Sequence, residues 1–233
     1  MKIENAVALV TGANRGIGKA FVESLLAAGA AKVYAAARDP SSIGTKGAEA
    51  IALDVTRPDS VAAAAKRCTD VTLLVNNAGI ALNMGFLADD AIAAARAELE
   101  TNYFGPLAMA RGFAPVLAAN GGGAIVNMLS VASWISSPVL ATYAASKSAA
   151  WSLTNWLRHE LRAQGTRLIG VHVAFVDTDM VSAFEVPKTS PAEVVRQVLA
   201  AIEAGRDEVL ADEMTRQVKR GLSDEAAIYL QPR

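Results

Sequence analysis

A glycine-rich turn near the start of the chain constrains the fold more than any other feature of the sequence. The apolar run Ala6–Val10 has the length of a buried strand. It leads into the turn Thr11–Gly18, from which a periodic helix, Gly16–Ala28, begins. Glycines let a backbone approach a pyrophosphate closely, and the start of a helix presents free N–H groups and the positive end of its dipole. A strand, a glycine turn and a helix in this order therefore predict a phosphate-binding site, although a glycine triplet alone would be weak evidence.

The rest of the chain repeats this alternation of short apolar runs and longer helical segments. The sequence predicts further strands at 32–36, 50–53, 71–75, 124–128, 168–175 and 208–210. It predicts helices at 58–67, 88–117 (interrupted near Gly105-Pro106), 141–163 and 190–204. Strands that alternate with helices imply parallel βαβ units with helices on both faces of the sheet. Because no linker rich in Pro, Gly or Ser divides the 233 residues, we expect one doubly wound α/β domain over residues 1–233.

Composition and charge argue against several classes of partner. The 22 Lys and Arg residues are scattered and balance 23 Asp and Glu, so neither a nucleic-acid-binding stripe nor a polybasic membrane anchor is predicted. The run Ala6–Val10 is far too short to span a bilayer. The single cysteine, Cys68, excludes an intrachain disulfide, and no carboxylate–histidine cluster has metal-ligand spacing. We therefore expect a protein of the reducing cytoplasm that binds no nucleic acid, membrane or metal.

The end of the second predicted strand bears on which dinucleotide would bind. In dinucleotide-binding folds an acidic residue at this place holds the adenosine ribose. Here the position falls on Ala37, and Arg38 follows it. A guanidinium pairs with a 2′-phosphate that an acid would repel, and Arg15 in the glycine turn can reach the same region. These residues favour NADP(H); if the strand ends later, Asp39 would hold the ribose, so NAD(H) stays an alternative.

Three polar residues in the second half of the chain suggest chemistry on a hydroxyl or carbonyl group. Tyr143 and Lys147 lie four residues apart on the helix predicted at 141–163, so they share a face. A nearby lysine cation, together with an oxidised nicotinamide ring, favours the phenolate; lowering the pKa from about 10 by about three units corresponds to roughly 4 kcal/mol. Tyr143 could then act as general acid or base near neutral pH. Ser130, just past the strand at 124–128, could hydrogen-bond a substrate oxygen as charge develops.

These residues are part of a longer series of motifs. In chain order the sequence contains Thr11-Gly12-x-x-x-Gly16-x-Gly18, Asp54, Asn76-Asn77-Ala78-Gly79, Asn102, Ser130 and Tyr143-x-x-x-Lys147. This series resembles the short-chain dehydrogenase/reductase family along nearly the whole chain. The resemblance implies a Rossmann-like parallel sheet of seven strands. It also implies a homodimer or homotetramer built on the helices near Ala97–Leu117 and Ala141–Ala163.

The resemblance also implies roles for individual residues. Asn102, Ser130, Tyr143 and Lys147 would be the catalytic residues; Asn102 would interrupt a helix and position a water behind Lys147 for proton relay, and Lys147 would bind the ribose. The residues implied to bind the cofactor are Gly12, Asn14, Arg15, Gly16, Ile17, Gly18, Arg38, Asp54, Val55, Asn77, Ala78, Gly79, Tyr143, Lys147, Val176 and Thr178.

The stretch after the sixth predicted strand departs from the family pattern. Val173 and Ala174 stand where the family usually has Pro-Gly, although Val176 and Thr178 remain in register. The following segment, about 178–190, covers the substrate in relatives and is short here, so we expect a small or open lid. The apolar side chains expected near the substrate are Phe184, Met180, Trp134, Leu140, Leu82 and Trp151. His159 and His172 are interpreted as structural.

The function expected from these residues is NADPH-dependent reduction of small or hydrophobic aldehydes and ketones, or the reverse oxidation of alcohols. A 3-oxoacyl-carrier reductase is the alternative, but the basic patch that would bind a carrier is diffuse: Arg96, Arg111, Arg158 and Arg162. A non-catalytic NADP(H) sensor would not need the catalytic residues. A sugar-nucleotide epimerase or dehydratase would need a larger C-terminal domain and a different glycine spacing.

Overall fold

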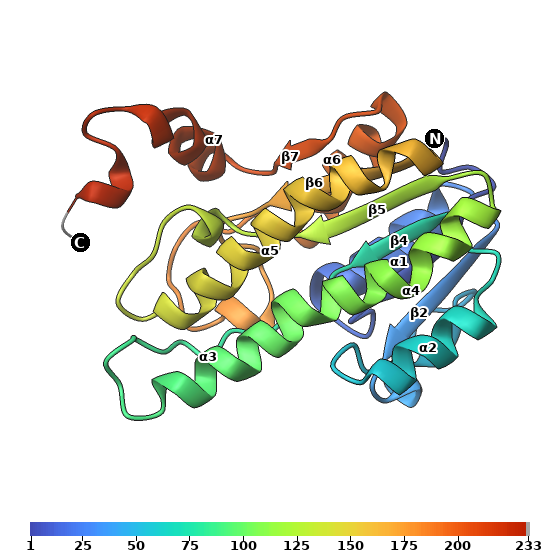
Figure 1. Cartoon of the computed structure of the whole chain (residues 1–233), viewed down its shortest axis with the longest axis horizontal. Helices are drawn as coiled ribbons and strands as arrows, with labels where there is room; N and C mark the ends of the chain where they lie inside the picture. Colours follow the sequence, from blue (N-terminus) through green and yellow to red (C-terminus); the bar gives the residue numbers. More distant parts are fainter. Residues whose placement is uncertain (232–233) are drawn as a thin grey trace.

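Seven parallel strands form a single sheet in the computed structural model, which describes residues 1–231 (Figure 1). The strands are β1 (Val7–Thr11), β2 (Lys32–Ala37), β3 (Glu49–Ala52), β4 (Leu73–Asn76), β5 (Gly123–Met128), β6 (Thr166–His172) and β7 (Glu208–Leu210). Their order across the sheet is β3-β2-β1-β4-β5-β6-β7. The direction of winding reverses between β1 and β4, and parallel sheets bind ligands in the crevice at such a switch point. The predicted doubly wound, Rossmann-like sheet is confirmed.

Helices cover both faces of the sheet and explain why its central strands are mostly apolar. The helices are α1 (Gly16–Ala27), α2 (Pro58–Arg67), α3 (Ala91–Leu99), α4 (Gly105–Ala119), α5 (Ala141–Glu160), α6 (Pro191–Ala204) and α7 (Glu213–Arg220). On one face Phe21 of α1 and Val198 of α6 pack in one core cluster, and on the other face Phe113 of α4 and Leu157 of α5 pack in a second. Strands buried on both faces read as continuous apolar runs because neither face meets water.

The helix predicted at 88–117 is interrupted directly before Gly105-Pro106, close to the predicted break. The break is a π-helical turn, Glu100–Phe104, between α3 and α4, and it is centred on Asn102. Pro106, in the first turn of α4, has no N–H to donate to a carbonyl of the preceding turn. Gly105 allows close packing: a Cβ there would lie 2.9 Å from Cγ2 of Val55. Short π-helical turns inside helices are frequent at functional sites.

The sixth strand is shorter than predicted. Its ladder with β5 ends with Val171 opposite Met128, and β6 stops at His172 rather than at Phe175. Beyond it the Ala174 N–H is bound by the Asp212 carboxylate at 2.7 Å instead of by a neighbouring strand. The chain therefore leaves the sheet earlier and forms the loop that precedes α6.

The C-terminal part of the chain follows its capping signals. Ser190 caps α6 by accepting a hydrogen bond from the Glu193 N–H at 3.2 Å, as the sequence predicted. Asp212 caps α7 through the Thr215 N–H at 2.8 Å, and Figure 1 shows α7 beyond the carboxyl end of β7. Within residues 1–231 no helix combines the length and apolarity that a bilayer crossing requires.

Candidate active site

The glycine turn presents bare backbone to the switch point of the sheet. Gly12 and Gly16 have φ of +62° and +52°, in the left-handed region where a Cβ is disfavoured. A Cβ at Gly18 would lie 2.1 Å from the Gly12 oxygen, so α1 packs directly on the turn. Asn14 is exposed and Ile17 packs partly against the core. The free N–H groups at the start of α1 are thus accessible to an anion, and the cradle fits a pyrophosphate.

The end of β4 holds the glycine turn in place. Thr11 Oγ1 accepts hydrogen bonds from the N–H groups of Asn77 and Ala78, both at 3.0 Å, and donates to the Val75 oxygen at 3.2 Å. The Asn77 side chain donates to the oxygens of Thr11 and Gly12 at 2.9 and 3.2 Å. The predicted Asn-Asn-Ala-Gly segment therefore ties together the two strands that flank the crevice.

The residues after β2 lie where an adenosine ribose is held in such folds. β2 ends at Ala37, so the exposed Arg38 is the first residue past the strand. Asp39 is engaged locally, because its carboxylate accepts from both the N–H and the hydroxyl of Ser41, at 2.9 and 2.7 Å. A hydrogen bond from Thr56 chiefly lowers the pKa of Asp54, and the charge of Arg38 also contributes. The charge of Arg38 thus acts on Asp54, whereas the Asp39 carboxylate is engaged by Ser41.

Arg15 and the segment after β6 approach the glycine turn from the other side. Arg15 forms an exposed ion pair with Asp179, which follows β6, at 3.3 Å. A Cβ on Gly16 would lie 3.1 Å from Cγ2 of Thr178, which places Thr178 against the turn. Val176 is buried and forms a parallel bridge with Thr189, so the two ends of the predicted lid segment lie next to each other.

Tyr143 and Lys147 project from the first turns of α5 into the interior. Lys147 Nζ donates to the Met128 oxygen at 2.8 Å and lies 5.7 Å from the centre of the Tyr143 ring. Burial lowers the pKa of Lys147 to about 8. Burial also raises the pKa of Tyr143 to about 12; Ser130 opposes this rise and the charge of Glu98 adds to it. The chain by itself therefore favours the phenol, because desolvation of the phenolate outweighs the hydrogen bond of Ser130. The expected phenolate applies to a site that also holds an oxidised nicotinamide ring.

Ser130 follows β5 and lies in a tight turn. Its Oγ accepts from the Ala132 N–H at 3.1 Å and donates to the Val173 oxygen at 3.3 Å. Its hydroxyl affects the pKa of Tyr143, which shows that the two side chains are neighbours. Ser130, Tyr143 and Lys147, from two separate segments of the chain, thus meet at the carboxyl end of β5.

Asn102 lies in the π-helical turn and its side chain is fully engaged. Oδ1 accepts from the Ile80 N–H, and Nδ2 donates to the Ile80 oxygen and to Ser146 Oγ, each at 2.9 Å. A Cβ on Gly79 would lie 3.1 Å from Asn102 Oδ1 and 3.7 Å from Lys147 Nζ, so these residues are close neighbours. The structure thus confirms the helix break at Asn102, and a water-positioning role would fall to its backbone.

Glu98 is a polar neighbour of the site that the sequence analysis missed. It is fully buried one turn before Asn102, and its Oε1 accepts from the Leu82 N–H at 2.7 Å. Its Oε2 has no hydrogen-bond partner among the described residues. Glu98 and Asn102 therefore both form hydrogen bonds with the backbone of the same segment, residues 80–82. Only its position one helical turn from Asn102 could have pointed to it.

Five of the six apolar residues expected to line the substrate site fall into two groups, and the sixth, Leu140, is half-buried directly before α5. Leu82 and Met180 are each 44% exposed, and Phe184 packs on Phe175 with ring centres 5.5 Å apart. Trp134 and Trp151 instead pack on each other edge to face, at 6.2 Å. The first group can still meet a substrate, whereas the second belongs to the packing around the end of β6.

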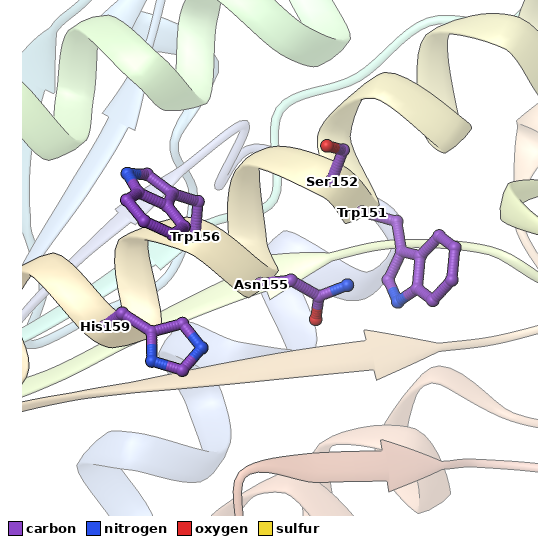
Figure 2. A pocket seen from close by; sticks show the side chains of 5 residues that line it. All are labelled: Trp151, Ser152, Asn155, Trp156 and His159. Atoms are coloured by element: carbon purple, nitrogen blue, oxygen red, sulfur yellow. The ribbon is translucent and has the colours of Figure 1, made fainter.

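A separate hollow lies along α5. It is lined by Trp151, Ser152, Asn155, Trp156 and His159, all from α5 (Figure 2). Trp151 was expected near the substrate, whereas the other four lining residues were not predicted as part of the site. Among residues 1–231, no group of three His, Cys, Asp or Glu side chains could hold a metal ion.

Comparisons of sequence agree with the class of protein that this fold and site define. Residues 6–188 match the family model for short chain dehydrogenases. The chain is 33% identical over 222 residues to the 3-oxoacyl-(acyl-carrier-protein) reductase of Vibrio cholerae, covering 88% of this chain and 85% of that protein. It is 28% identical over 246 residues to dehydrogenase/reductase SDR family member 7B of Bos taurus, covering 91% and 75%. The chain belongs to the short-chain dehydrogenase/reductase family.

Solved structures give the same result. A short chain dehydrogenase from Burkholderia cenocepacia in complex with NADP superposes with a TM-score of 0.94 at 41% identity, covering all of both chains. A short chain dehydrogenase/reductase from Burkholderia phymatum in complex with NAD gives a TM-score of 0.84 at 28% identity, covering 95% of this chain and 94% of that one.

Proposed function

We propose that the chain is an NADP(H)-dependent oxidoreductase that interconverts small or hydrophobic aldehydes or ketones with their alcohols. The observation that carries the proposal is the meeting of Ser130, Tyr143 and Lys147 at the carboxyl end of β5, next to the glycine turn. A phenol, a hydroxyl and an ammonium at one place suit proton transfer to a carbonyl oxygen.

Ser130, Tyr143 and Lys147 have separate roles in binding and in proton transfer. The cofactor, when bound, supplies or accepts the hydride at the carbonyl carbon. In reduction Ser130 donates a hydrogen bond to the substrate oxygen and Tyr143 gives that oxygen its proton, so the carbonyl becomes an alcohol. In oxidation Tyr143 takes the hydroxyl proton back. Lys147 holds the ribose, and its positive charge stabilises the phenolate that forms when Tyr143 gives up its proton.

The preference for NADP(H) rests on Arg38. It is the first residue after β2, whereas Asp39 is engaged by Ser41. A guanidinium there suits a 2′-phosphate. The relative from Burkholderia cenocepacia, which is 41% identical, was solved in complex with NADP and supports this choice.

A second candidate is reduction of 3-oxoacyl groups on a carrier. It is favoured by the 33% identity to the Vibrio cholerae reductase. Against it, Arg158 of the expected basic patch donates to the oxygens of Leu168 and Asp207 and is thus engaged within the fold. Cytoplasmic location is likewise our proposal, because Cys68 as the only cysteine allows no intrachain disulfide.

The test is NADPH oxidation with a panel of aldehydes, ketones and one 3-oxoacyl thioester, for wild type and for Tyr143→Phe. We expect turnover by the wild type on simple carbonyls and its loss in the variant, with NADPH binding retained. Turnover on the thioester alone would favour the carrier reductase. Tight NADPH binding without turnover on any carbonyl would overturn the proposal in favour of a sensor.

A further inference from the structure

His172 is a buried titratable residue that the proposed mechanism does not use. It is the last residue of β6 and is only 1% exposed. Its Nδ1 lies 3.1 Å from the backbone oxygen of Ser130. A carbonyl oxygen can only accept a hydrogen bond, so the geometry requires the ring proton to be on Nδ1.

The ring is fixed from the sides as well. It stacks on Trp134 with ring centres 3.9 Å apart and planes 20° from parallel. Its other nitrogen, Nε2, lies 3.7 Å from a carboxylate oxygen of Glu208, beyond hydrogen-bond distance, and Glu208 is paired with Lys219 of α7. The plane and the tautomer of the ring are thus set by packing and by a single directed hydrogen bond.

The same end of β6 also binds the Ser130 hydroxyl. Ser130 Oγ donates to the oxygen of Val173, the residue after His172. The Ser130 oxygen receives a further hydrogen bond from the Ser133 N–H at 2.9 Å, within the same turn. Residues 172 and 173 therefore hold the backbone and the side chain of Ser130, and a rotation of this turn would move the hydroxyl relative to Tyr143.

We propose that His172 is a positioning residue, which holds the Ser130 turn through its Nδ1–H so that the Ser130 hydroxyl faces Tyr143. The proposal rests on the proposed catalytic role of Ser130. Burial chiefly lowers the pKa of His172 to about 4, so the ring stays neutral between pH 5 and 8. The hydrogen-bond donor is therefore constant between pH 5 and 8.

Two substitutions separate the donor from the volume of the ring. His172→Asn keeps an N–H donor close to the position of Nδ1, whereas His172→Leu removes it. His159→Asn, at the chain's other histidine, is the matched control, since His159 is exposed on α5. We expect His172→Leu to lower kcat about tenfold or more while KM for NADPH changes less than about threefold, and His172→Asn to recover most of kcat. Equal losses in both His172 variants, or none in His172→Leu, would overturn the proposal.

A measurement that needs no enzymatic turnover tests the role of His172 independently of the proposed function. The two histidines are distinguished by nitrogen NMR of the rings, using His159→Asn to assign them. We expect the Nδ1–H form for His172 in the wild type. We also expect faster exchange of the Ala132 amide, which donates to Ser130 Oγ, in His172→Leu but not in His172→Asn. An Nε2–H form, or unchanged exchange, would contradict the role of His172 even if the enzyme is active. Absent wild-type turnover would instead contradict the proposed function.

Discussion

Arg38 and Asp39 stand side by side after β2, yet only one of them is engaged locally. Asp39 accepts two hydrogen bonds from Ser41. Replacing Arg38 by Ala removes the guanidinium that would pair with a 2′-phosphate, and a charge-assisted hydrogen bond contributes about 1.5–3 kcal/mol. We expect kcat/KM for NADPH to fall about tenfold to a hundredfold and that for NADH to change little. Asp39→Asn is the control. If this variant no longer uses NADH and Arg38→Ala has no effect, Asp39 rather than Arg38 binds the adenosine ribose.

Lys147 gives the reaction a dependence on pH that can be worked out from its burial. Because burial lowers the pKa of Lys147 to about 8, its positive charge is present below that pH and is lost above it. Tyr143, with a pKa raised to about 12, remains protonated throughout this range. The value of kcat/KM for NADPH reports ionisations of the free enzyme. It should be level below about pH 7 and decline above about pH 8, and a level profile up to pH 10 would show that Lys147 stays charged.

At the scale of elements, the contact between α1 and the glycine turn is the tightest constraint on the cofactor cradle. A Cβ at Gly18 would lie 2.1 Å from the Gly12 oxygen, a backbone atom that can move only with the turn. We expect Gly18→Ala to destabilise the fold by about 1–3 kcal/mol and to weaken NADPH binding. Urea unfolding and titration of NADPH measure the two effects.

Gly44 provides the matched control for this substitution. A Cβ there would meet no atom within 4 Å, so Gly44→Ala should leave both the free energy of unfolding and NADPH binding nearly unchanged. If Gly18→Ala behaves like Gly44→Ala, the turn adjusts freely and close packing of α1 does not shape the cradle.

Elements with local signals were predicted well from the sequence, and elements that depend on distant contacts were not. α2 and β7 have the predicted bounds, and α6 begins at the cap that Ser190 forms. The end of β6 was misplaced because it depends on Asp212, which is 38 residues away and takes the Ala174 N–H. The apolar run continues to Phe175, so its composition could not reveal this end.

The same distinction holds for the site. The motifs placed Ser130, Tyr143 and Lys147 correctly in one region, since each lies at the end of a strand or on the following helix. The contacts of His172 with Ser130 and of Glu98 with Leu82 span 42 and 16 residues and carry no sequence motif. The effect of burial on the Tyr143 pKa could not be predicted either, because spacing reveals a nearby cation but not the degree of burial.

At the scale of the whole molecule, the outer face of α5 is suited to contact with a second copy of the chain. Ala145, Ala149 and Trp156 follow helical spacing along this face, and Trp156 is 63% exposed and borders the hollow in Figure 2. Small residues allow two helices to approach closely, and exposed tryptophans are enriched where protein surfaces associate. We propose that the chain forms a homodimer or homotetramer through α5 and the neighbouring α4.

Sedimentation velocity tests this assembly. We expect Trp156→Glu to shift the protein to a smaller species, because a carboxylate buried between two helices would lose its hydration without a partner. Leu87→Glu is the matched control: Leu87 is fully exposed and lies outside α4 and α5, so the same charge there should leave the oligomer intact. A monomeric wild type would exclude the assembly. An unchanged oligomer in Trp156→Glu would place the contact elsewhere, since a face that packs helix against helix cannot accommodate an unpaired charge at Trp156.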